Sequence, residues 1–419
     1  MLLPLLCFHI IACCLSLVYV AEYYGDLHIV AFDKARIYEA ALFVLPYLTL
    51  SFGFVLSRFS FGYFVGFYSY SMFLCYLWIA PSSPFQYDHR LGAISAFASS
   101  LAFLIPALFV NSQFRQKLVL PEGGLEYLLS LILILAISVI AVGALYNFRL
   151  VGIGDIYKFR GEFELPAFLR YPIGILSSAL LPFAFACYSV RGRPILAAIA
   201  VALMLLIYPI TLTKLALLAP FWLLFLMVLS RFFEARVSVV LSLLLLITAG
   251  ILAELLFEAG VLSYPWFIGY FGIVNFRMVA FTSIALDVYN DFFSGHSVTY
   301  FCQMAFLKPF VSCPYADPLS VVMSNTYHLG FLNASLFASE GIASVGPMLA
   351  PLTALACGLV ISVANRVSAD LPSRFILLSA GLLPQEFLNV PLSTNLLSNG
   401  AALLFLLWYV TPRSIFARK

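Results

Sequence analysis

The sequence predicts an all-α, polytopic helical membrane protein, and two observations carry this prediction. First, 63% of the 419 residues are hydrophobic and 10% are charged, whereas soluble domains are about half apolar and about a quarter charged. Second, the apolar residues fall in runs of about 20, the length of a spanning helix, and not in the alternating pattern of a membrane barrel. We therefore expect a single membrane domain over 1–419, with about 12 transmembrane helices.

Each apolar run is interpreted as one span. Residues 2–20 are interpreted as a first span and not as a removed signal peptide, because they lack a basic start and a small-residue cleavage site. Prolines inside several runs are tolerated where neighbouring helices satisfy the freed carbonyl. The eleventh run is the weakest, since Pro384, Glu386 and Pro391 crowd its second half. The predicted spans are 2–20, 40–57, 61–80, 91–111, 127–147, 171–189, 195–212, 214–230, 237–257, 345–363, 375–393 and 396–411.

The basic residues of the short loops predict the orientation, since cytoplasmic loops carry an excess of Lys and Arg. Alternate loops hold twelve of the 22 Lys and Arg residues and only four acids. Both termini are therefore predicted to be cytoplasmic. The outer face then carries the long segments 148–170 and 260–344, and we expect the larger one to bear short amphipathic helices. The cytoplasmic cations are Arg58, Arg115, Lys117, Arg191, Arg193, Arg231, Arg236, Arg366, Arg374, Arg413, Arg418 and Lys419.

The other Lys and Arg residues fall on the predicted outer face. One interpretation is that long loops are translocated regardless of charge. The other is that these cations meet an anion at the outer membrane surface. The net charge of +3 is too small to indicate nucleic acid as a partner.

Two polar stretches hold candidate cations. In the segment 155–170, Arg160 and Arg170 bracket two glutamates, and an arginine fork suits phosphate oxygens; the alternative is a solvated loop whose Arg and Glu side chains pair with each other. Lys214 lies in the sequence TLTK between two apolar runs. It must either extend to the outer headgroups or face a polar cavity.

The stretch 275–296 is expected to form an amphipathic helix on the outer leaflet. Asp287 and Asp291 are four residues apart and share a helix face. Arg277 lies about three turns earlier, near that face. We expect the cation and both acids to turn toward a cavity.

Residues 325–347 lead into the tenth span. Asn333, Phe337, Glu340 and Ser344 fall on one stripe if this stretch is helical. A glutamate on a helix that enters the membrane is costly unless it points into a wet cavity. The competing interpretation is that Glu340 caps the start of the helix.

The eight cysteines show no metal-ligand spacing, and we expect most of them to be small buried side chains. Cys302 and Cys313 share the long outer segment, and the sequence leaves open whether they pair there, as an oxidising compartment allows, or are small buried side chains like the others. No phosphate-binding loop and no zinc-hydrolase motif occurs in the sequence, so neither a metal nor a cofactor is expected.

The order of four weak motifs resembles that of the Wzy-type O-antigen and repeat-unit polymerases of bacteria. The run RMVAFTSIALDVYNDFFSGHSVTYF is followed by NASLFASEGIASVGP, in which Asn333, Ala334, Ala338, Glu340, Gly341 and Gly346 match the family pattern. The Arg-Gly-Glu element at 160–162 and the Thr-Lys hairpin at 213–214 are also similar. The resemblance covers about 150–350 and is only topological elsewhere.

The resemblance implies a membrane glycosyltransferase with a GT-C-like architecture in the bacterial inner membrane. Such an enzyme joins undecaprenyl-pyrophosphate-linked repeat units into a surface polysaccharide at the periplasmic face. Its expected partners are the lipid-linked substrate, membrane lipid, a Wzz-like co-polymerase and a flippase. The expected catalytic residues are Arg160, Arg277, Asp291 and Glu340, and the expected substrate-binding residues are Arg170, Lys214, Asp287, His328 and Asn333. We expect Arg160, Arg170, Lys214 and Arg277 to converge on one outer-facing cavity.

Two other functions remain open. The O-antigen ligases are close relatives, but they carry an H-x-H-N-like element where this chain has only His328. A flippase or transporter of lipid-linked oligosaccharide would place its charges along a path through the membrane and is often built from two related halves. Here the charges gather at one face, which favours an enzyme.

Overall fold

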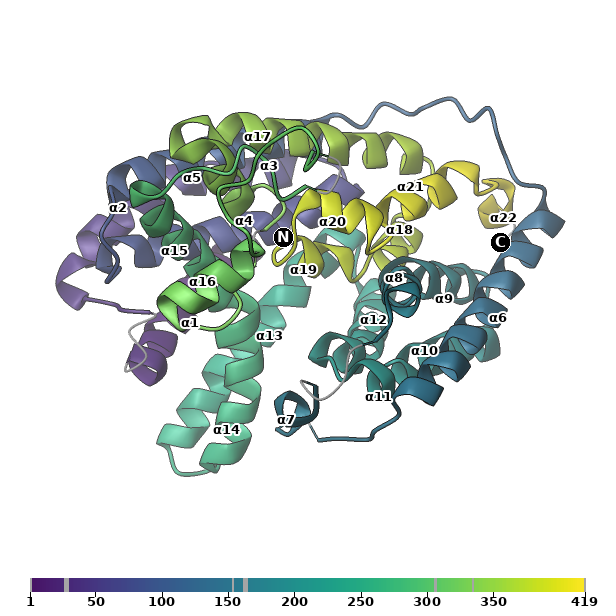
Figure 1. Cartoon of the computed structure of the whole chain (residues 1–419). Coiled ribbons are helices and arrows are strands. Elements are labelled where there is room, and N and C mark those ends of the chain that lie inside the picture. Colours follow the sequence, from purple (N-terminus) through teal and green to yellow (C-terminus); the bar gives the residue numbers. More distant parts are fainter. Residues whose placement is uncertain are drawn as a thin grey trace.

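The computed structural model describes residues 2–25, 30–152, 154–160, 165–304, 307–333 and 335–417. This part of the chain is helical, has no strand, and contains a single β-bridge between Leu336 and Pro391 (Figure 1). The predicted all-α class is therefore confirmed.

The elements, with η marking 3-10 and π turns, are α1 (Leu2–Tyr24), η2 (Lys34–Arg36), α2 (Ile37–Leu48), α3 (Ser51–Leu56), α4 (Phe61–Ile79), η3 (Ala80–Ser82), α5 (His89–Phe109), α6 (Glu122–Tyr146), α7 (Ile156–Arg160), α8 (Ala167–Ile175), η4 (Leu176–Leu180), α9 (Leu181–Val190), α10 (Pro194–Leu206), α11 (Tyr208–Thr211), α12 (Lys214–Phe232), α13 (Ala235–Glu258), α14 (Tyr264–Phe271), η5 (Gly272–Ala280), α15 (Phe281–Gly295), α16 (Leu319–Tyr327), α17 (Ala338–Ser368), α18 (Ser373–Ser379), α19 (Leu383–Phe387), α20 (Leu392–Leu397), α21 (Ala401–Val410) and α22 (Ser414–Ala417).

Within the described residues, eleven helical segments are long and apolar enough to cross a membrane. Ten of them coincide, within a few residues, with the first ten predicted spans. The chain is thus a polytopic helical membrane protein. The eleven segments are Leu2–Tyr24, Lys34–Leu56, Phe61–Ser82, His89–Phe109, Glu122–Tyr146, Ala167–Val190, Pro194–Thr211, Lys214–Phe232, Ala235–Glu258, Tyr264–Gly295 and Ala338–Ser368.

Helix α4 forms the centre of the bundle. Nearly all of its side chains are buried, including a series of Phe and Tyr rings. Its N-terminus is capped by Ser60, whose hydroxyl accepts a hydrogen bond from the Tyr63 N–H at 3.1 Å. A side chain that accepts from an early N–H of a helix stabilises it by about 1 kcal/mol. The surrounding helices therefore pack on an aromatic column.

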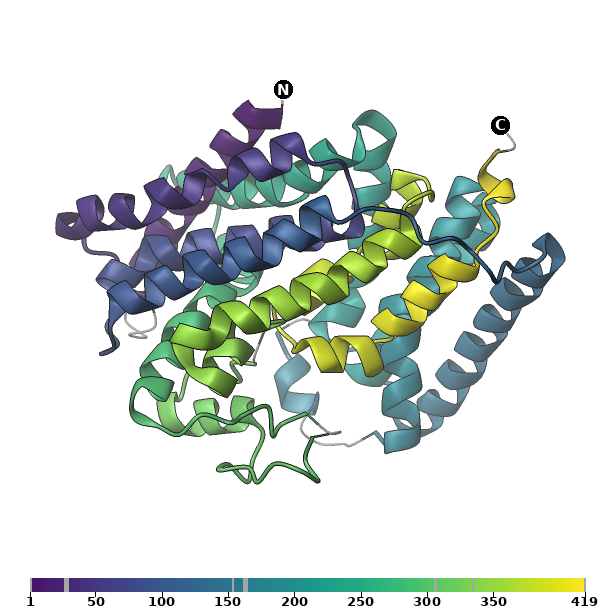
Figure 2. The ribbon, with the colours of Figure 1, turned by 90° about the horizontal axis from the view of Figure 1, so that it is seen from above.

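Helices α5 and α17 lie side by side over most of their length (Figure 2). Their backbones approach closely at Gly358, where an added Cβ would lie 2.6 Å from the Phe103 carbonyl oxygen. Small residues permit this distance between spanning helices. Near its start, α17 is interrupted at Gly346, whose φ of 76° and ψ of 168° fit only glycine. The first turns of α17 therefore point in a different direction from the rest.

Connections rich in basic residues meet at one end of the bundle, which we call the basic end. Arg236 donates to the Ser57 carbonyl at 3.2 Å. Arg366 donates to the Ser112 carbonyl at 2.9 Å, and Arg413 donates to the Val367 carbonyl at 2.8 Å. These contacts join loops that the sequence analysis assigned to one face.

The remaining connections meet at the opposite end, which we call the far end. The link after α1 contacts the link after α4, where the Asp33 N–H donates to Ser82 Oγ at 3.0 Å. The hydroxyl of Tyr23, near the end of α1, donates to Glu254 at 2.8 Å, near the end of α13. The segment 148–152 contacts α11 at the same end of α6 and α10. The predicted outer segments begin here.

The structure differs from the prediction over 264–295. We expected short helices on the membrane surface, but α14, η5 and α15 form one helical run of 32 residues. Its first turns pack on Tyr23, with the Phe267 ring 5.0 Å away, and its last turns contact the α4–α5 link through Asp291. Both ends of the run therefore contact the far end. The π segment η5 lies in the middle of this run and has more residues per turn than an α-helix. Such a segment bends the helix and moves the residues that follow it to a different face.

The last two predicted spans are not continuous helices. The segment 375–393 is divided into α18 and α19, and 396–411 into the end of α20 and α21. Pro384 and Pro391 start new helices there, and Gly400 precedes α21 with a φ of 78°. Proline removes a helical N–H and positive φ favours glycine. Hydropathy alone does not detect such breaks.

Candidate functional site

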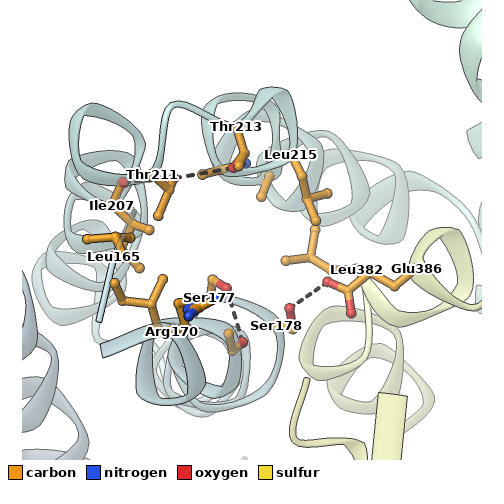
Figure 3. A pocket seen from close by; sticks show the side chains of 14 residues that line it. Leu165, Arg170, Ser177, Ser178, Ile207, Thr211, Thr213, Leu215, Leu382 and Glu386 are labelled. Carbon is orange, nitrogen blue, oxygen red and sulfur yellow. Dashed lines mark hydrogen bonds between the residues drawn. The ribbon is translucent and has the colours of Figure 1, made fainter. Parts of the chain in front are cut away.

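A cavity of about 360 Å³ opens toward the far end of the bundle. It lies between α8 with η4 on one side, the α11–α12 turn on another, and α19 (Figure 3). Most of its lining is aliphatic. The polar lining residues converge from these three directions and are Arg170, Ser177, Ser178, Thr211, Thr213 and Glu386.

Arg170 lies on α8 and extends to one side of the opening (Figure 3). Pro166 precedes this helix with an extended conformation, which begins it at Ala167. The π segment η4 follows, and two consecutive residues of it, Ser177 and Ser178, both line the cavity. Within the described residues, no carboxylate oxygen lies within 4.0 Å of the Arg170 guanidinium.

The α11–α12 turn faces Arg170 across the cavity. Leu212 has a φ of 47°, and Thr213 caps α12 by accepting from the Ala216 N–H at 3.3 Å. The hydroxyls of Thr211 and Thr213 lie 3.3 Å apart. This geometry places two hydroxyls at the rim. The predicted residue Lys214 follows directly and is half-buried, with its own contact within the protein.

Glu386 forms the third wall and is 4% exposed. Its Oε1 accepts a 2.5 Å hydrogen bond from the Ser178 hydroxyl, and its Oε2 accepts from the Asn399 amide at 3.1 Å. A buried carboxylate is costly unless donors compensate it, and here one donor serves each oxygen. In the sequence, Glu386 was only a reason to doubt the eleventh span. The cost of placing an acid inside an apolar run is the signal that could have indicated a candidate site there.

Asp287 and Asp291 lie outside this cavity, in a cluster of tyrosines at the far end. The Tyr87 hydroxyl donates to Asp287 at 2.5 Å, and Tyr327 donates to Asp291 Oδ2 at 2.6 Å. Asp291 Oδ1 accepts from the Gln86 N–H at 2.8 Å. The two acids therefore join the α4–α5 link and α16 to α15.

The tyrosines of this cluster remain hydrogen-bond donors. Burial and the adjacent Asp287 raise the pKa of Tyr87 well above its usual value. Two causes raise the pKa of Tyr327: burial is the larger, and the hydrogen bond to Asp291 is the second. Neither hydroxyl ionises near neutral pH, so both can donate to the neighbouring acids.

Arg277 does not share a face with these acids, contrary to the prediction. It is exposed on η5 with its guanidinium carbon 3.8 Å from the Phe281 ring centroid, whereas Asp287 is buried. The π turns of η5 change the periodicity on which the prediction depended. Arg277 is also absent from the lining of the 360 Å³ cavity. Of the three expected cations whose side chains the structure describes, Arg170 lines the cavity, Lys214 follows the lining residue Thr213, and Arg277 lies elsewhere.

The predicted helical stripe from 333 to 344 begins later than expected. Helix α17 starts at Ala338, so Asn333 lies before it and is exposed. Glu340 is 6% exposed and is not among the residues that line the cavity. His328 ends α16 with a φ of 57° and is exposed. The structure thus separates these three residues from Arg170.

Some predicted residues lie outside the described part of the structure. Arg160 ends α7, but its side chain is not among the described groups. Glu162 and Ala334 also lie outside the described residues. Their predicted roles stay predictions.

Cys302 and Cys313 form a disulfide, with their Cα atoms 5.2 Å apart. Nearby, the Thr299 N–H donates to the Ala343 carbonyl at 2.8 Å, which attaches this loop to the start of α17. Disulfides persist in oxidising compartments. The pairing agrees with the predicted exposure of 260–344 on the outer face. Over the described residues, no group of three or more His, Cys, Asp or Glu side chains is arranged to hold a metal.

Comparison with known proteins finds no matching family model, no matching curated protein and no matching solved structure.

Proposed function

We propose that this chain is a membrane glycosyltransferase of the Wzy polymerase type, which joins polyprenyl-pyrophosphate-linked repeat units at the outer face of a bacterial inner membrane. The observation that carries the proposal is the far-end cavity. Arg170 meets there the 211–214 turn, which contains the Thr-Lys hairpin that resembles a family motif, and a buried carboxylate forms the third wall.

Arg170 is suited to the leaving group of such a reaction. When a sugar leaves pyrophosphate, negative charge develops on the diphosphate oxygens, and preorganised donors that face this charge lower the barrier. A planar guanidinium can donate two parallel hydrogen bonds to those oxygens. Within the described residues, no carboxylate oxygen lies within 4.0 Å of the Arg170 guanidinium, which supports this role.

Glu386 is suited to the acceptor. A sugar hydroxyl is a weak nucleophile until a base takes its proton, and positioned carboxylates perform this role. The hydrogen bonds from Ser178 and Asn399 fix both carboxylate oxygens at the cavity wall. Further hydroxyls from Thr211 and Thr213 lie at the rim and match the hydrogen-bonding groups of a sugar ring.

The proposed step is one glycosyl transfer. The acceptor hydroxyl oxygen bonds to the anomeric carbon of the donor sugar, and the bond from that carbon to the diphosphate oxygen breaks. The electron pair leaves with the polyprenyl diphosphate beside Arg170, and the hydroxyl proton moves to Glu386. The cavity volume falls within the range of small-ligand sites, roughly 300–1,000 Å³, so it accommodates the reacting ends while the prenyl chains stay in lipid.

The proposed step does not use the other predicted site residues. Arg277, Asp291 and Glu340 all lie outside the cavity lining. Their catalytic roles stay predictions, as do the substrate contacts of Asn333 and His328. The lipid-linked substrate, a Wzz-like co-polymerase and a flippase are the proposed partners.

The test is the surface glycan of cells that lack this gene, separated by length on a gel. A band of single repeat units, restored to a ladder by the wild-type gene, supports the polymerase. Loss of all attached glycan indicates a ligase instead. Accumulation of inward-facing lipid-linked units indicates a flippase. Either of the last two outcomes contradicts the proposal.

A further inference from the structure

A second cavity, of about 480 Å³, lies at the basic end of the bundle. It is formed where the α3–α4 and α12–α13 links meet the start of α18. Its lining contains Arg58, Arg236 and Arg374 but only one acid, Glu234. The proposed glycosyl transfer uses none of these residues.

The single acid does not neutralise the three cations. Glu234 pairs with Arg236 at 3.1 Å, and Arg236 also donates to the Ser57 carbonyl. Within the described residues, no carboxylate oxygen lies within 4.0 Å of Arg58 or Arg374. The Nε atom of Arg374 is buried and has no hydrogen-bond partner in that part of the chain. A buried donor without a partner costs free energy that a ligand acceptor would recover.

A fourth cation adds to this excess. Burial and the neighbouring Arg231 lower the pKa of Arg374, which reflects the repulsion between like charges in a confined space. Three serines, Ser57, Ser230 and Ser373, also line the cavity. The cavity thus offers several charged and neutral donors with few acceptors, which is the composition of an anion site.

The rim of this cavity is apolar. Leu56 is 75% exposed and Phe233 is 42% exposed, and both belong to the cavity lining. The next residue, Phe232, is 77% exposed. A soluble anion gains nothing from such side chains, whereas an acyl chain packs on them. Basic pockets between spanning helices bind anionic lipid headgroups.

We propose that the basic-end cavity binds the phosphate group of an anionic phospholipid, with Arg58 and Arg374 as the principal donors. The site is separate from the far-end cavity, and this proposal does not rest on the proposed function. It places a bound phospholipid at the end of the bundle opposite the proposed glycosyl-transfer site.

The test is native mass spectrometry of the full chain purified in detergent. Phosphatidylglycerol and phosphatidylcholine with identical acyl chains are added separately, and the bound fraction of each is measured. We expect selective binding of phosphatidylglycerol. Arg374→Gln and Arg58→Gln should each weaken it about fivefold, the effect of one basic residue near an anionic lipid. Excess inorganic phosphate should not displace the lipid.

The control is Arg115→Gln, which removes an exposed arginine of the α5–α6 link outside the cavity. It should leave lipid binding unchanged. Thermal unfolding without added lipid verifies that each variant is folded, and Arg374→Lys provides a conservative variant with partial binding. Equal binding of the two lipids, equal loss in Arg115→Gln, or displacement by inorganic phosphate would overturn the proposal.

Discussion

Glu386 and Arg170 come from segments more than 200 positions apart in the chain, and the packing of the folded bundle brings them to one cavity. Burial of Glu386 depends on the hydroxyl of Ser178, which η4 directs toward it. A carboxylate held by two neutral donors stays available as a proton acceptor. At the scale of single residues, the account therefore depends on one cation and one acid in the same cavity.

The cation can be tested by substitution. Arg170→Ala should lower the rate of polymer formation by roughly 10²–10³, the usual effect of removing one donor that stabilises developing charge. Arg170→Lys should recover only part of this loss, because a point charge cannot replace the planar fork. The measurement is glycan length and amount in cells that make matched levels of protein. Arg90→Ala removes an exposed arginine at the same end and should behave as wild type; equal effects of the two substitutions to Ala would argue against the cavity.

Single helices show where sequence reasoning succeeded and failed. Apolar runs of about 20 residues located α1, α6 and α13 to within a few residues. The 264–295 run was misread because its polar residues, including Asp287 and Asp291, resemble a surface loop. In the structure these acids are satisfied by tyrosines from other segments, a contact that periodicity cannot reveal.

The break in α17 provides a test at the scale of an element. Gly346 has a φ of 76° and a ψ of 168°, a region in which other residues are strained by about 1–3 kcal/mol. Gly346→Ala should therefore lower the free energy of unfolding by about that amount. Thermal unfolding in detergent measures the change. Gly123→Ala, in the first turn of α6 with open space around its Cα, should not destabilise the protein; a similar loss there would contradict the argument.

The tyrosine cluster provides a second test of this kind. Tyr327→Phe removes the hydroxyl that donates to Asp291 at 2.6 Å. Because hydrogen bonds to charged groups contribute about 1.5–3 kcal/mol, we expect a lower unfolding temperature and faster proteolysis of the loop between α15 and α16. Tyr300→Phe alters an exposed ring in the same loop and serves as control. No difference between the two variants would show that the Asp291 link does not hold α16.

The whole molecule has two chemically different ends. The positive-inside pattern grouped loops that the structure joins through Arg236, Arg366 and Arg413. The far-end cavity could be predicted only in part: the polar stretches 155–170 and 211–214 indicated Arg170 and the turn before Lys214. Glu386 could not be placed, because its partners Ser178 and Asn399 are distant in sequence and meet only in the folded bundle.

Topology is tested by single cysteines in a variant whose free cysteines are replaced, labelled in intact cells with an impermeant thiol reagent. Arg193→Cys at the basic end should be protected, and His296→Cys after α15 should be labelled. The disulfide between Cys302 and Cys313 agrees with this orientation. Labelling of both positions from one side would overturn the assignment of the two ends.

The most direct test uses the full chain reconstituted in vesicles with a lipid-linked repeat unit. The account predicts that wild-type protein converts the units into a ladder of longer glycans without any nucleotide. Glu386→Gln should keep the fold but lower the rate by roughly 10²–10⁴, as expected for loss of a general base. Glu39→Gln, at an exposed acid of α2, should match the wild type. Failure of the wild-type protein to lengthen the glycan, or an undiminished rate in Glu386→Gln, would contradict the account.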